Sequence, residues 1–174
     1  MSKIDRIASN TPWEPIFGYV RAVRAGGWLC ISGTTATDER GLIVGGGQMY
    51  VQARQALLNI KRHVEGAGLR LSDVVRTRAF VTDMSRFAEV ARAHKEVMGE
   101  YPPAESCIEV SKLVHPDMLI EIEADVYAGG DATSAPPGSR AAEVRKPAPK
   151  VNRSAKKASP PPKKASRPKP RKKR

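Results

Sequence analysis

The stretch Leu-Ile-Glu-Ile-Glu-Ala-Asp-Val-Tyr, residues 119–127, alternates apolar and acidic side chains from its second residue to its eighth. A period of two residues is typical of a β-strand that buries one face and leaves the other face polar. We therefore predict a strand over Leu119–Tyr127. The face expected in the core consists of Ile120, Ile122, Ala124 and Val126.

Outward from this strand, periodicity and turn residues predict the other elements. Further strands are expected at Gly18–Arg24, Trp28–Gly33, Gly41–Gly47, Val74–Thr82 and Ser106–Leu113. Apolar spacings of three and four residues predict two helices, one over Met49–Gly68 and one from Asp83 or Ser85 to about Gly99. This order predicts an α/β domain of the α+β kind, in which two helices pack on one face of a single mixed six-stranded sheet.

The same spacings predict which side chains face the core. On the first helix they are Ala53, Leu57, Ile60, Val64 and Ala67. On the second helix they are Phe87, Val90, Ala91, His94 and Met98, and we interpret His94 as a packed side chain rather than a ligand. On the strand over Val74–Thr82 they are Val75, Thr77, Ala79 and Val81.

A single layer of helices leaves the opposite face of the sheet open. Apolar strand residues such as Trp28, Cys30 and Phe80 cannot all face the helices if their neighbours do. Self-association is the simplest way to cover such a face, so the residues alone predict an oligomer.

Charge divides the chain into two parts. Residues 129–174 hold 15 of the 30 Lys and Arg residues but only 2 of the 18 acidic residues, so the first 128 residues carry a net charge of −1. Segments such as Ser159–Lys164 combine Pro, Lys and Ser with almost no aliphatic side chains, and such a composition cannot offset the entropy of ordering. We predict a globular domain at residues 1–128 and a disordered basic tail at 129–174.

Several classes of protein are disfavoured by composition. The sequence has no apolar run near the ~20 residues of a membrane span, and its first residues do not resemble a secretory signal. Cys30 and Cys107 are expected to be reduced thiols, which favours a cytoplasmic protein. His and Cys residues are too scattered for a metal site, and Gly45-Gly46-Gly47 lacks the Lys-Ser/Thr of a phosphate loop, so we expect no cofactor.

Separated motifs resemble one known family. Pro103-Ala104-Glu105-Ser106-Cys107, followed by Ile120-Glu121-Ile122-Glu123-Ala124, is similar to the C-terminal signature of the RidA/YjgF (reactive intermediate deaminase) family, and the resemblance runs from about Ile16 to Ala128. It implies a chorismate-mutase-like fold, a homotrimer, and a small-molecule cleft at each subunit interface. Active members of the family hydrolyse 2-imino acids to 2-keto acids and ammonia.

The resemblance also implies roles for individual residues. Glu121 corresponds to the glutamate that positions the attacking water, and the residues expected to line the cleft are Tyr19, Ser32, Gly33 and Cys107. Glu105 stands where the family has the arginine that binds the substrate carboxylate. Two like charges ~4 Å apart repel by roughly 4 kcal/mol at an effective dielectric constant near 20, so a 2-imino acid should bind poorly beside Glu105.

Three interpretations of Glu105 remain open at this point. Glu105 selects a cationic or neutral ligand, or acts as an acid or base beside Glu121. Alternatively, Arg76 or Arg78 restores carboxylate binding from another strand. In the third interpretation the catalytic site has decayed or diverged.

Three simpler explanations compete with functional ones. The stripe of Glu121, Glu123 and Asp125 is equally typical of a solvated or interface-paired surface, and Cys107 is more typical of a buried or cleft-lining thiol than of a nucleophile. The basic tail, above all residues 140–174, is suited to sequence-independent binding of DNA, RNA or another acidic partner, but it is equally a solubilising extension. A non-catalytic ligand-binding protein, or a trimer tethered to nucleic acid, is therefore the alternative to an enzyme.

Overall fold

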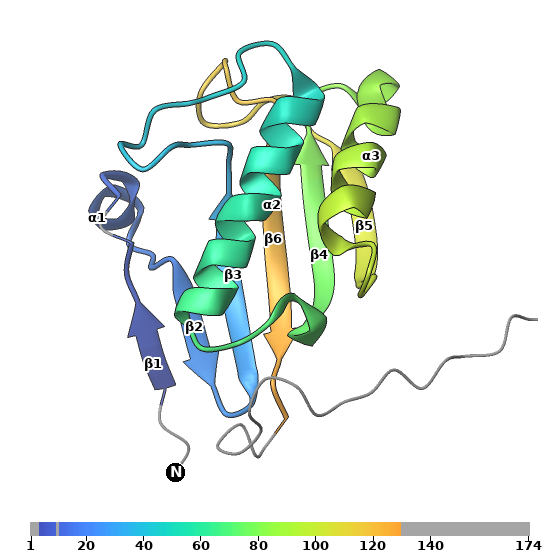
Figure 1. Ribbon diagram of the computed structural model, residues 1–174. Coiled ribbons are helices and arrows are strands. Elements are labelled where there is room, and N and C mark those ends of the chain that lie inside the picture. The colour runs from blue at the N-terminus through green and yellow to red at the C-terminus, as the bar shows by residue number, and fades with distance from the viewer. Residues whose placement is uncertain (1–3, 10, 130–174) are drawn as a thin grey trace, which may run out of the picture. The chain divides into compact units, whose positions relative to one another are not determined.

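The computed structural model describes residues 4–9 and 11–129 of the 174-residue chain. Six strands and three α-helices follow one another along these residues (Figure 1), with short 3₁₀ turns at Leu71–Asp73 and Met84–Arg86. The strands are β1 (Ile4–Ile7), β2 (Ala22–Ala25), β3 (Trp28–Thr34), β4 (Val74–Val81), β5 (Ala104–Glu109) and β6 (Ile120–Tyr127). The helices are α1 (Trp13–Phe17), α2 (Met49–Gly66) and α3 (Phe87–Met98).

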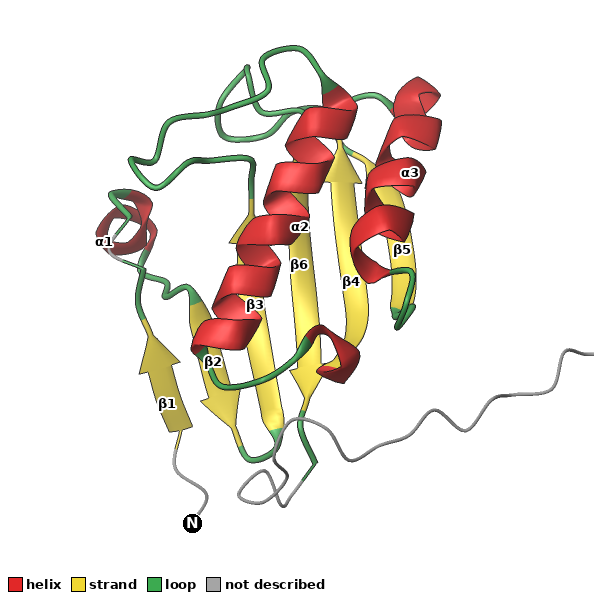
Figure 2. Cartoon of the chain, in the orientation of Figure 1, coloured by secondary structure: helices red, strands yellow, loops and turns green. Residues whose placement is uncertain are grey.

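The strands form a single sheet in the order β1-β2-β3-β6-β4-β5. Every neighbouring pair is antiparallel except β4 and β5, which are parallel, so the sheet is mixed. The long helices α2 and α3 cover one face of it, and the short helix α1 lies beside the upper end of β1 (Figures 1 and 2). The predicted six-stranded mixed sheet with two helices on one face, which is a chorismate-mutase-like α+β arrangement, is confirmed.

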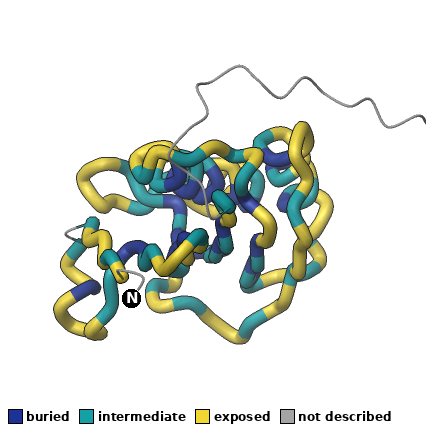
Figure 3. The backbone as a smooth tube through the Cα atoms, turned by 90° about the horizontal axis from the view of Figure 1, so that it is seen from below, coloured by how far each residue is buried: buried dark blue, intermediate teal, exposed yellow. Residues whose placement is uncertain are grey.

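The core lies between the sheet and the two long helices, where buried segments gather in the view of Figure 3. The alternation predicted over residues 119–127 is confirmed, because the four apolar residues of β6 are at most 1% exposed. Four of the five residues predicted on the inner face of α2 are completely buried, and they are Ala53, Leu57, Ile60 and Val64. The fifth, Ala67, packs against the edge of this core.

The sixth strand is not the predicted one. Gly41–Gly47 contains no strand, and only one isolated bridge joins Thr37 to Ile43 there. Gly41 and Gly45 adopt positive φ angles, which turn the backbone left-handed and prevent continuous pairing. Ile4–Ile7 supplies the sixth strand instead, as β1 on the edge of the sheet.

Two side chains predicted in the core are exposed. The β4–β6 ladder shifts register between Val74 and Arg76, so Val74 is buried and Val75 is 39% exposed. Phe87 is 50% exposed because α3 begins at this residue, before the helix reaches the sheet. Val90 and Met98 of the same helix are buried as predicted.

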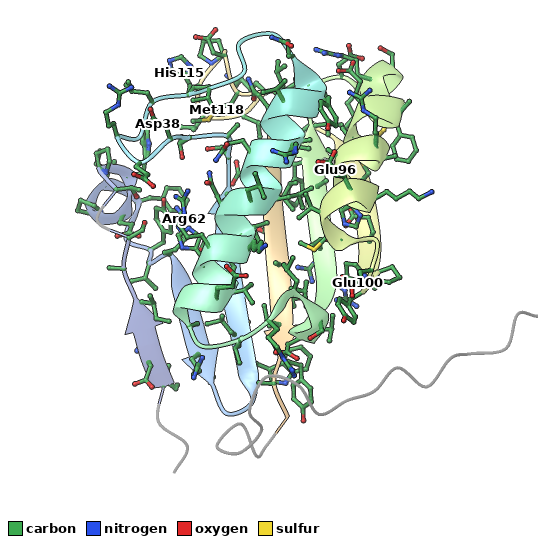
Figure 4. The ribbon with its side chains drawn as sticks, viewed as in Figure 1. Asp38, Arg62, Glu96, Glu100, His115 and Met118 are labelled. Atoms are coloured by element: carbon green, nitrogen blue, oxygen red, sulfur yellow. The ribbon has the colours of Figure 1, made fainter. Side chains whose placement is uncertain are left out.

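Buried amides of α2 hold the loops at one end of the sheet. Gln52 is completely buried, and its Nε2 donates to the carbonyls of Gly46 and Asp117 at 2.7 Å each, while its Oε1 accepts from the Leu119 N–H at 2.9 Å. This bonding brings the segment before α2 and the segment before β6 together. Asp38, His115 and Met118 of these segments lie near that end in Figure 4.

The face of the sheet opposite the helices carries exposed apolar side chains. Trp28 is 46% exposed and Tyr127 is 45% exposed, and their ring centroids lie 4.9 Å apart on the paired strands β3 and β6. Cys30 is also exposed, as predicted for this face. Among the residues that the structure describes, no helix has the length and apolar character needed to cross a bilayer. The predicted tail at 129–174 lies outside the described residues, apart from Gly129 itself.

Candidate functional site

Glu121 lies on the open face of the sheet. It stands between the buried residues Ile120 and Ile122 on β6, so its side chain points away from the helices. Burial raises the pKa of the Glu121 carboxyl, and the nearby carboxylate of Glu123 raises it further, while the positive charge of Arg21 acts in the opposite direction. A carboxyl group whose pKa is raised toward neutral pH is suited to exchange a proton or to orient water.

Gly33 on β3 lies directly against this carboxyl group. A Cβ atom at position 33 would overlap Oε1 of Glu121, so the absence of a side chain is what admits the carboxyl group. The close approach depends on a bulge, because the β3–β6 ladder shifts register between Ile31 and Thr34. The two residues inside this interval, Ser32 and Gly33, form what we call the β3 bulge.

Ser32 and Tyr19 complete the same region. The Ser32 hydroxyl donates to the Val20 carbonyl at 2.8 Å, and the Ser32 N–H donates to the Arg21 carbonyl at 3.0 Å. The Tyr19 hydroxyl accepts from Nη2 of Arg21 at 3.5 Å. Four of the six predicted site residues thus gather at one corner of the sheet, which we call the corner site: Tyr19, Ser32, Gly33 and Glu121.

Glu105 lies on β5 and points to the opposite side of the sheet. It is paired in register with Thr77 of β4, whose buried hydroxyl donates to Oε2 of Glu105. His94 of α3 approaches both residues, with its Nε2 at 3.0 Å from the Thr77 hydroxyl oxygen and 3.5 Å from Oε2 of Glu105. We call Thr77, His94 and Glu105 the edge cluster.

Hydrogen-bond chemistry assigns the proton positions in the edge cluster. The hydroxyl of Thr77 has one hydrogen, and that hydrogen is given to Glu105. The remaining contact to His94 therefore requires that Nε2–H of the imidazole donates to the Thr77 oxygen. The packed histidine that we predicted is thus also hydrogen-bonded, and it supports an acceptor carboxylate at position 105.

Cys107 shares the strand and the sheet face of Glu105. It is half-buried, and burial together with the charge of Glu105 raises the pKa of its thiol. A raised pKa keeps the sulfur protonated near neutral pH, and the thiolate is the reactive form. The interpretation of Cys107 as a half-buried thiol rather than a nucleophile is therefore favoured.

A single chain does not bring the corner site and the edge cluster together. Glu121 pairs with Phe80, whereas Glu105 pairs with Thr77, three residues away along β4, and the two carboxylates lie on opposite faces. Strand β4 stands between them, so Glu105 does not lie beside Glu121 within one chain.

The alternative arginines also lie away from Glu105. Arg78 forms ion pairs with Glu123 at 3.4 Å and with Asp125 at 3.1 Å, which places it on the open face. Arg76 alternates with the buried Thr77 and pairs with Asp125 across the ladder. Within one chain, neither arginine lies on the Glu105 side of the sheet, and the acidic stripe is partly ion-paired.

Arg21 also reaches this region, and the sequence did not predict it there. Its side chain is buried to 8% exposure and contacts several groups of the corner site. Arginine is rarely buried unless it is paired, and nothing in the local pattern around residue 21 signals such burial. The described residues contain no group of three or more His, Cys, Asp or Glu side chains arranged to hold a metal ion.

Comparison with known proteins agrees with this fold. A RutC family protein of Pyrococcus horikoshii is 40% identical over 118 residues, which are 68% of this chain and 92% of that protein. A 2-iminobutanoate/2-iminopropanoate deaminase of Salmonella typhimurium is 38% identical over 121 residues, covering 68% of this chain and 93% of that enzyme.

Solved structures give the same result. A member of the YjgF/YER057c/UK114 family from Mycobacterium tuberculosis superimposes with a TM-score of 0.65 and 39% sequence identity, over 72% of this chain and 99% of that one. The family model described as Endoribonuclease L-PSP, which covers the RidA/YjgF proteins, matches residues 9–128. The chain therefore belongs to the RidA/YjgF family.

Proposed function

We propose that this protein binds a small metabolite in a cleft that a second copy of the chain completes, and that its hydrolysis of 2-imino acids is lost or altered. Relatives named 2-iminobutanoate/2-iminopropanoate deaminase define the parent activity. The observation that carries the proposal is Glu105, which replaces the arginine of the family signature and is held as a hydrogen-bond acceptor.

The edge cluster disfavours an anionic substrate. Thr77 donates its hydroxyl hydrogen to Glu105, and His94 donates to the Thr77 oxygen, so this chain of hydrogen bonds ends on the Glu105 carboxylate as an acceptor. Repulsion of roughly 4 kcal/mol between carboxylates ~4 Å apart corresponds to a loss of about 10³-fold in binding. A neutral or cationic imine or enamine fits such a site better than a 2-imino acid.

The separation of the two groups supports a cleft between subunits. The corner site offers Glu121 and a backbone shaped by Gly33, whereas Glu105 and Cys107 stand on β5 at the outer edge of the sheet. An edge strand and an open sheet face are the surfaces through which a second copy packs. In a homotrimer, the edge of one subunit would meet the corner site of the next.

The decisive experiment measures ammonia released from 2-iminobutanoate by the wild type and by Glu105→Arg. We expect the wild type to show little or no acceleration over spontaneous hydrolysis and the arginine variant to gain activity. Glu109→Arg is the matched control. It makes the same charge change on β5, four residues after Glu105. Adding Glu121→Gln to Glu105→Arg should abolish the gain, because the water-orienting carboxylate is then missing.

Each result of this experiment has a definite meaning. Full activity of the wild type would overturn the proposed effect of Glu105. Activity in the Glu105→Arg variant alone would support it. Inactivity of both proteins, with a neutral ligand still bound, would favour a non-catalytic binding protein.

A second candidate function rests on the charge of the C-terminal part. Residues 129–174 contain half of the Lys and Arg residues of the chain in about a quarter of its length. Such a segment neutralises phosphates without reading sequence, and several linked copies in one assembly strengthen weak contacts. In this case the domain would be a trimer tethered to nucleic acid.

A further inference from the structure

The mechanism proposed above leaves one buried charged side chain of the corner site without a role. Arg21 immediately precedes β2 and is 8% exposed. A guanidinium group is costly to bury unless its donors are paired, so the partners of Arg21 indicate what its burial maintains.

The first partner of Arg21 is the β3 bulge. Its Nη1 donates to the carbonyl of Gly33 at 2.7 Å, with further contacts to the Ser32 carbonyl at 3.3 Å and the Thr34 hydroxyl at 3.2 Å. Ser32 and Gly33 have no ladder partners on β6, because the register jumps between Ile31 and Thr34. A bulge leaves backbone carbonyls without donors from the neighbouring strand, and here the guanidinium supplies them.

The second partner of Arg21 is Tyr19. Nη2 donates to the Tyr19 hydroxyl at 3.5 Å, and the guanidinium carbon lies 5.8 Å from the centre of the tyrosine ring. One planar guanidinium group therefore contacts both the β3 bulge and Tyr19, and its donors have fixed relative directions.

The charge of Arg21 affects two titratable groups, Glu121 and His63. It lowers the pKa of Glu121, opposing the rise caused by burial and by Glu123, and it lowers the pKa of His63 in addition to the larger effect of burial. Phe80, the ladder partner of Glu121 on β4, is uncharged. Arg21 is thus the positive charge that opposes the effects of burial and Glu123 on the Glu121 carboxyl.

We propose that Arg21 is a positioning residue of the corner site, which holds the β3 bulge and the Tyr19 ring around the Glu121 carboxylate. It contacts backbone and neighbouring side chains rather than a ligand, so its effect on chemistry passes through Glu121. The effect on catalysis rests on the proposed function. The positions of the β3 bulge and of Tyr19 around Glu121, in contrast, are measurable without any substrate.

The test uses the full chain with three substitutions: Arg21→Gln, Arg21→Lys and, as matched control, Arg24→Gln. Arg24 lies on β2 and donates to the Ala67 carbonyl, away from the corner site, so its loss removes the same charge elsewhere. Carboxyl-carbon NMR follows the titration of Glu121, imidazole NMR follows His63, and backbone amide shifts follow the β3 bulge.

We expect Arg21→Gln to raise the titration midpoints of both Glu121 and His63 and to shift the amides of the β3 bulge. Arg21→Lys keeps the positive charge but loses the planar set of guanidinium donors. The titration midpoints of Glu121 and His63 should therefore return closer to wild-type values than the amide shifts of the β3 bulge. Arg24→Gln should leave all three signals at wild-type values. If Arg21→Gln does not fold, Arg21→Lys decides the question through the amide shifts alone.

Unchanged Glu121 titration and unchanged bulge amides in the folded Arg21 variants would overturn the proposal. These readouts are independent of turnover. Failure of every variant to release ammonia from 2-iminobutanoate would therefore bear on the proposed function and not on the positioning role of Arg21.

Discussion

At the residue scale, two carboxylates of the same chemistry are placed in opposite environments. Glu105 accepts a hydrogen bond from Thr77 and lies near the Nε2 of His94, on the helix side of the sheet. Glu121 lies on the other side, against the backbone of Gly33, where burial raises its pKa. The two surroundings therefore differ: Glu105 accepts a hydrogen bond from a buried hydroxyl, whereas burial suits Glu121 to exchange a proton.

Glu121→Gln should change the pH dependence of stability. Because the folded-state pKa of Glu121 is raised, its protonated form is favoured by folding, and this contribution is lost as pH rises through the folded-state pKa. The variant should therefore gain stability relative to the wild type on going from about pH 4 to pH 7. Thermal unfolding at both pH values measures this difference.

Glu39→Gln is the control for this measurement, since the Glu39 side chain is 87% exposed. It should show no such pH-dependent gain. An equal or smaller gain for Glu121→Gln at pH 7 than at pH 4 would contradict the raised pKa.

Gly33→Ala should displace the Glu121 carboxyl group while leaving the fold intact. The added methyl group overlaps the far end of a flexible side chain rather than the backbone, so the side chain must rotate away. We expect ligand affinity or activity to fall by at least about tenfold, since misplacement of a reacting group by about 1 Å costs up to ~10²-fold. Gly47→Ala, where a Cβ atom meets nothing within 4 Å, is the control. Equal effects of the two substitutions would contradict a role for the close approach.

At the scale of elements, the interior of the fold follows sequence patterns and its margins do not. The helix α2 and the strand β6 were predicted to within a few residues, because each repeats its apolar spacing over most of its length. β1 was missed because Ile4–Ile7 is an edge strand of only four residues, which is too short to show a clear alternation of apolar and polar side chains. Val75 was misplaced because a bulge inserts one extra residue into β4, which shifts the alternation, and the residue pattern alone does not indicate a bulge.

Gln52→Leu should destabilise the domain by about 3 kcal/mol. The substitution keeps a buried side chain of similar size but leaves the carbonyls of Gly46 and Asp117 and the N–H of Leu119 without their partner, and each unsatisfied buried group costs about 1–3 kcal/mol. Denaturant unfolding gives the change in the free energy of unfolding.

Gln55→Leu on the same helix provides the comparison for Gln52. Its amide is only partly buried and donates to a single acceptor, the side-chain oxygen of Asn59. We expect it to cost about 1 kcal/mol, because one acceptor rather than three groups loses its partner. A loss for Gln52→Leu no larger than that of Gln55→Leu would show that the loops at this end are held by other contacts.

At the scale of the whole molecule, the open sheet face is the surface that self-association would cover. Trp28 and Tyr127 stack on one another there and each is nearly half exposed, and Ile108 on β5 is 45% exposed. We predict that the wild type self-associates through this face and that Trp28→Lys forms smaller species, because a buried lysine without a partner is costly. Sedimentation analysis over a range of concentrations measures this change.

Phe87→Lys is the matched control for Trp28. Phe87 is 50% exposed but belongs to α3, on the helix side of the sheet. It should leave the assembly unchanged. A Trp28→Lys protein with the mass of the wild type at all concentrations would contradict the use of the open face.

Removal of residues 129–174 should abolish salt-sensitive binding of nucleic acid. The deleted part carries a net charge of +13, and the remaining part carries a net charge of −1. We expect the full chain to bind short DNA or RNA more tightly at 50 mM than at 200 mM salt, because binding releases counterions. The shortened protein should retain the assembly and lose this binding, as measured by fluorescence anisotropy. Equal binding by the two proteins would exclude the tail as the nucleic-acid contact.

The sequence by itself determined five of the six strands, the two long helices and the family, because periodic burial and short motifs are properties of consecutive residues. Only the tertiary structure decided that Glu105 belongs with Thr77 and His94, that Glu121 belongs with Gly33, and that Arg21 joins the corner site. These neighbours come from strand order and from a bulge, which arise between segments far apart in the chain. In β6, the alternation of side chains is a local property of the sequence, whereas the partners of its glutamates come from the neighbouring strands β3 and β4.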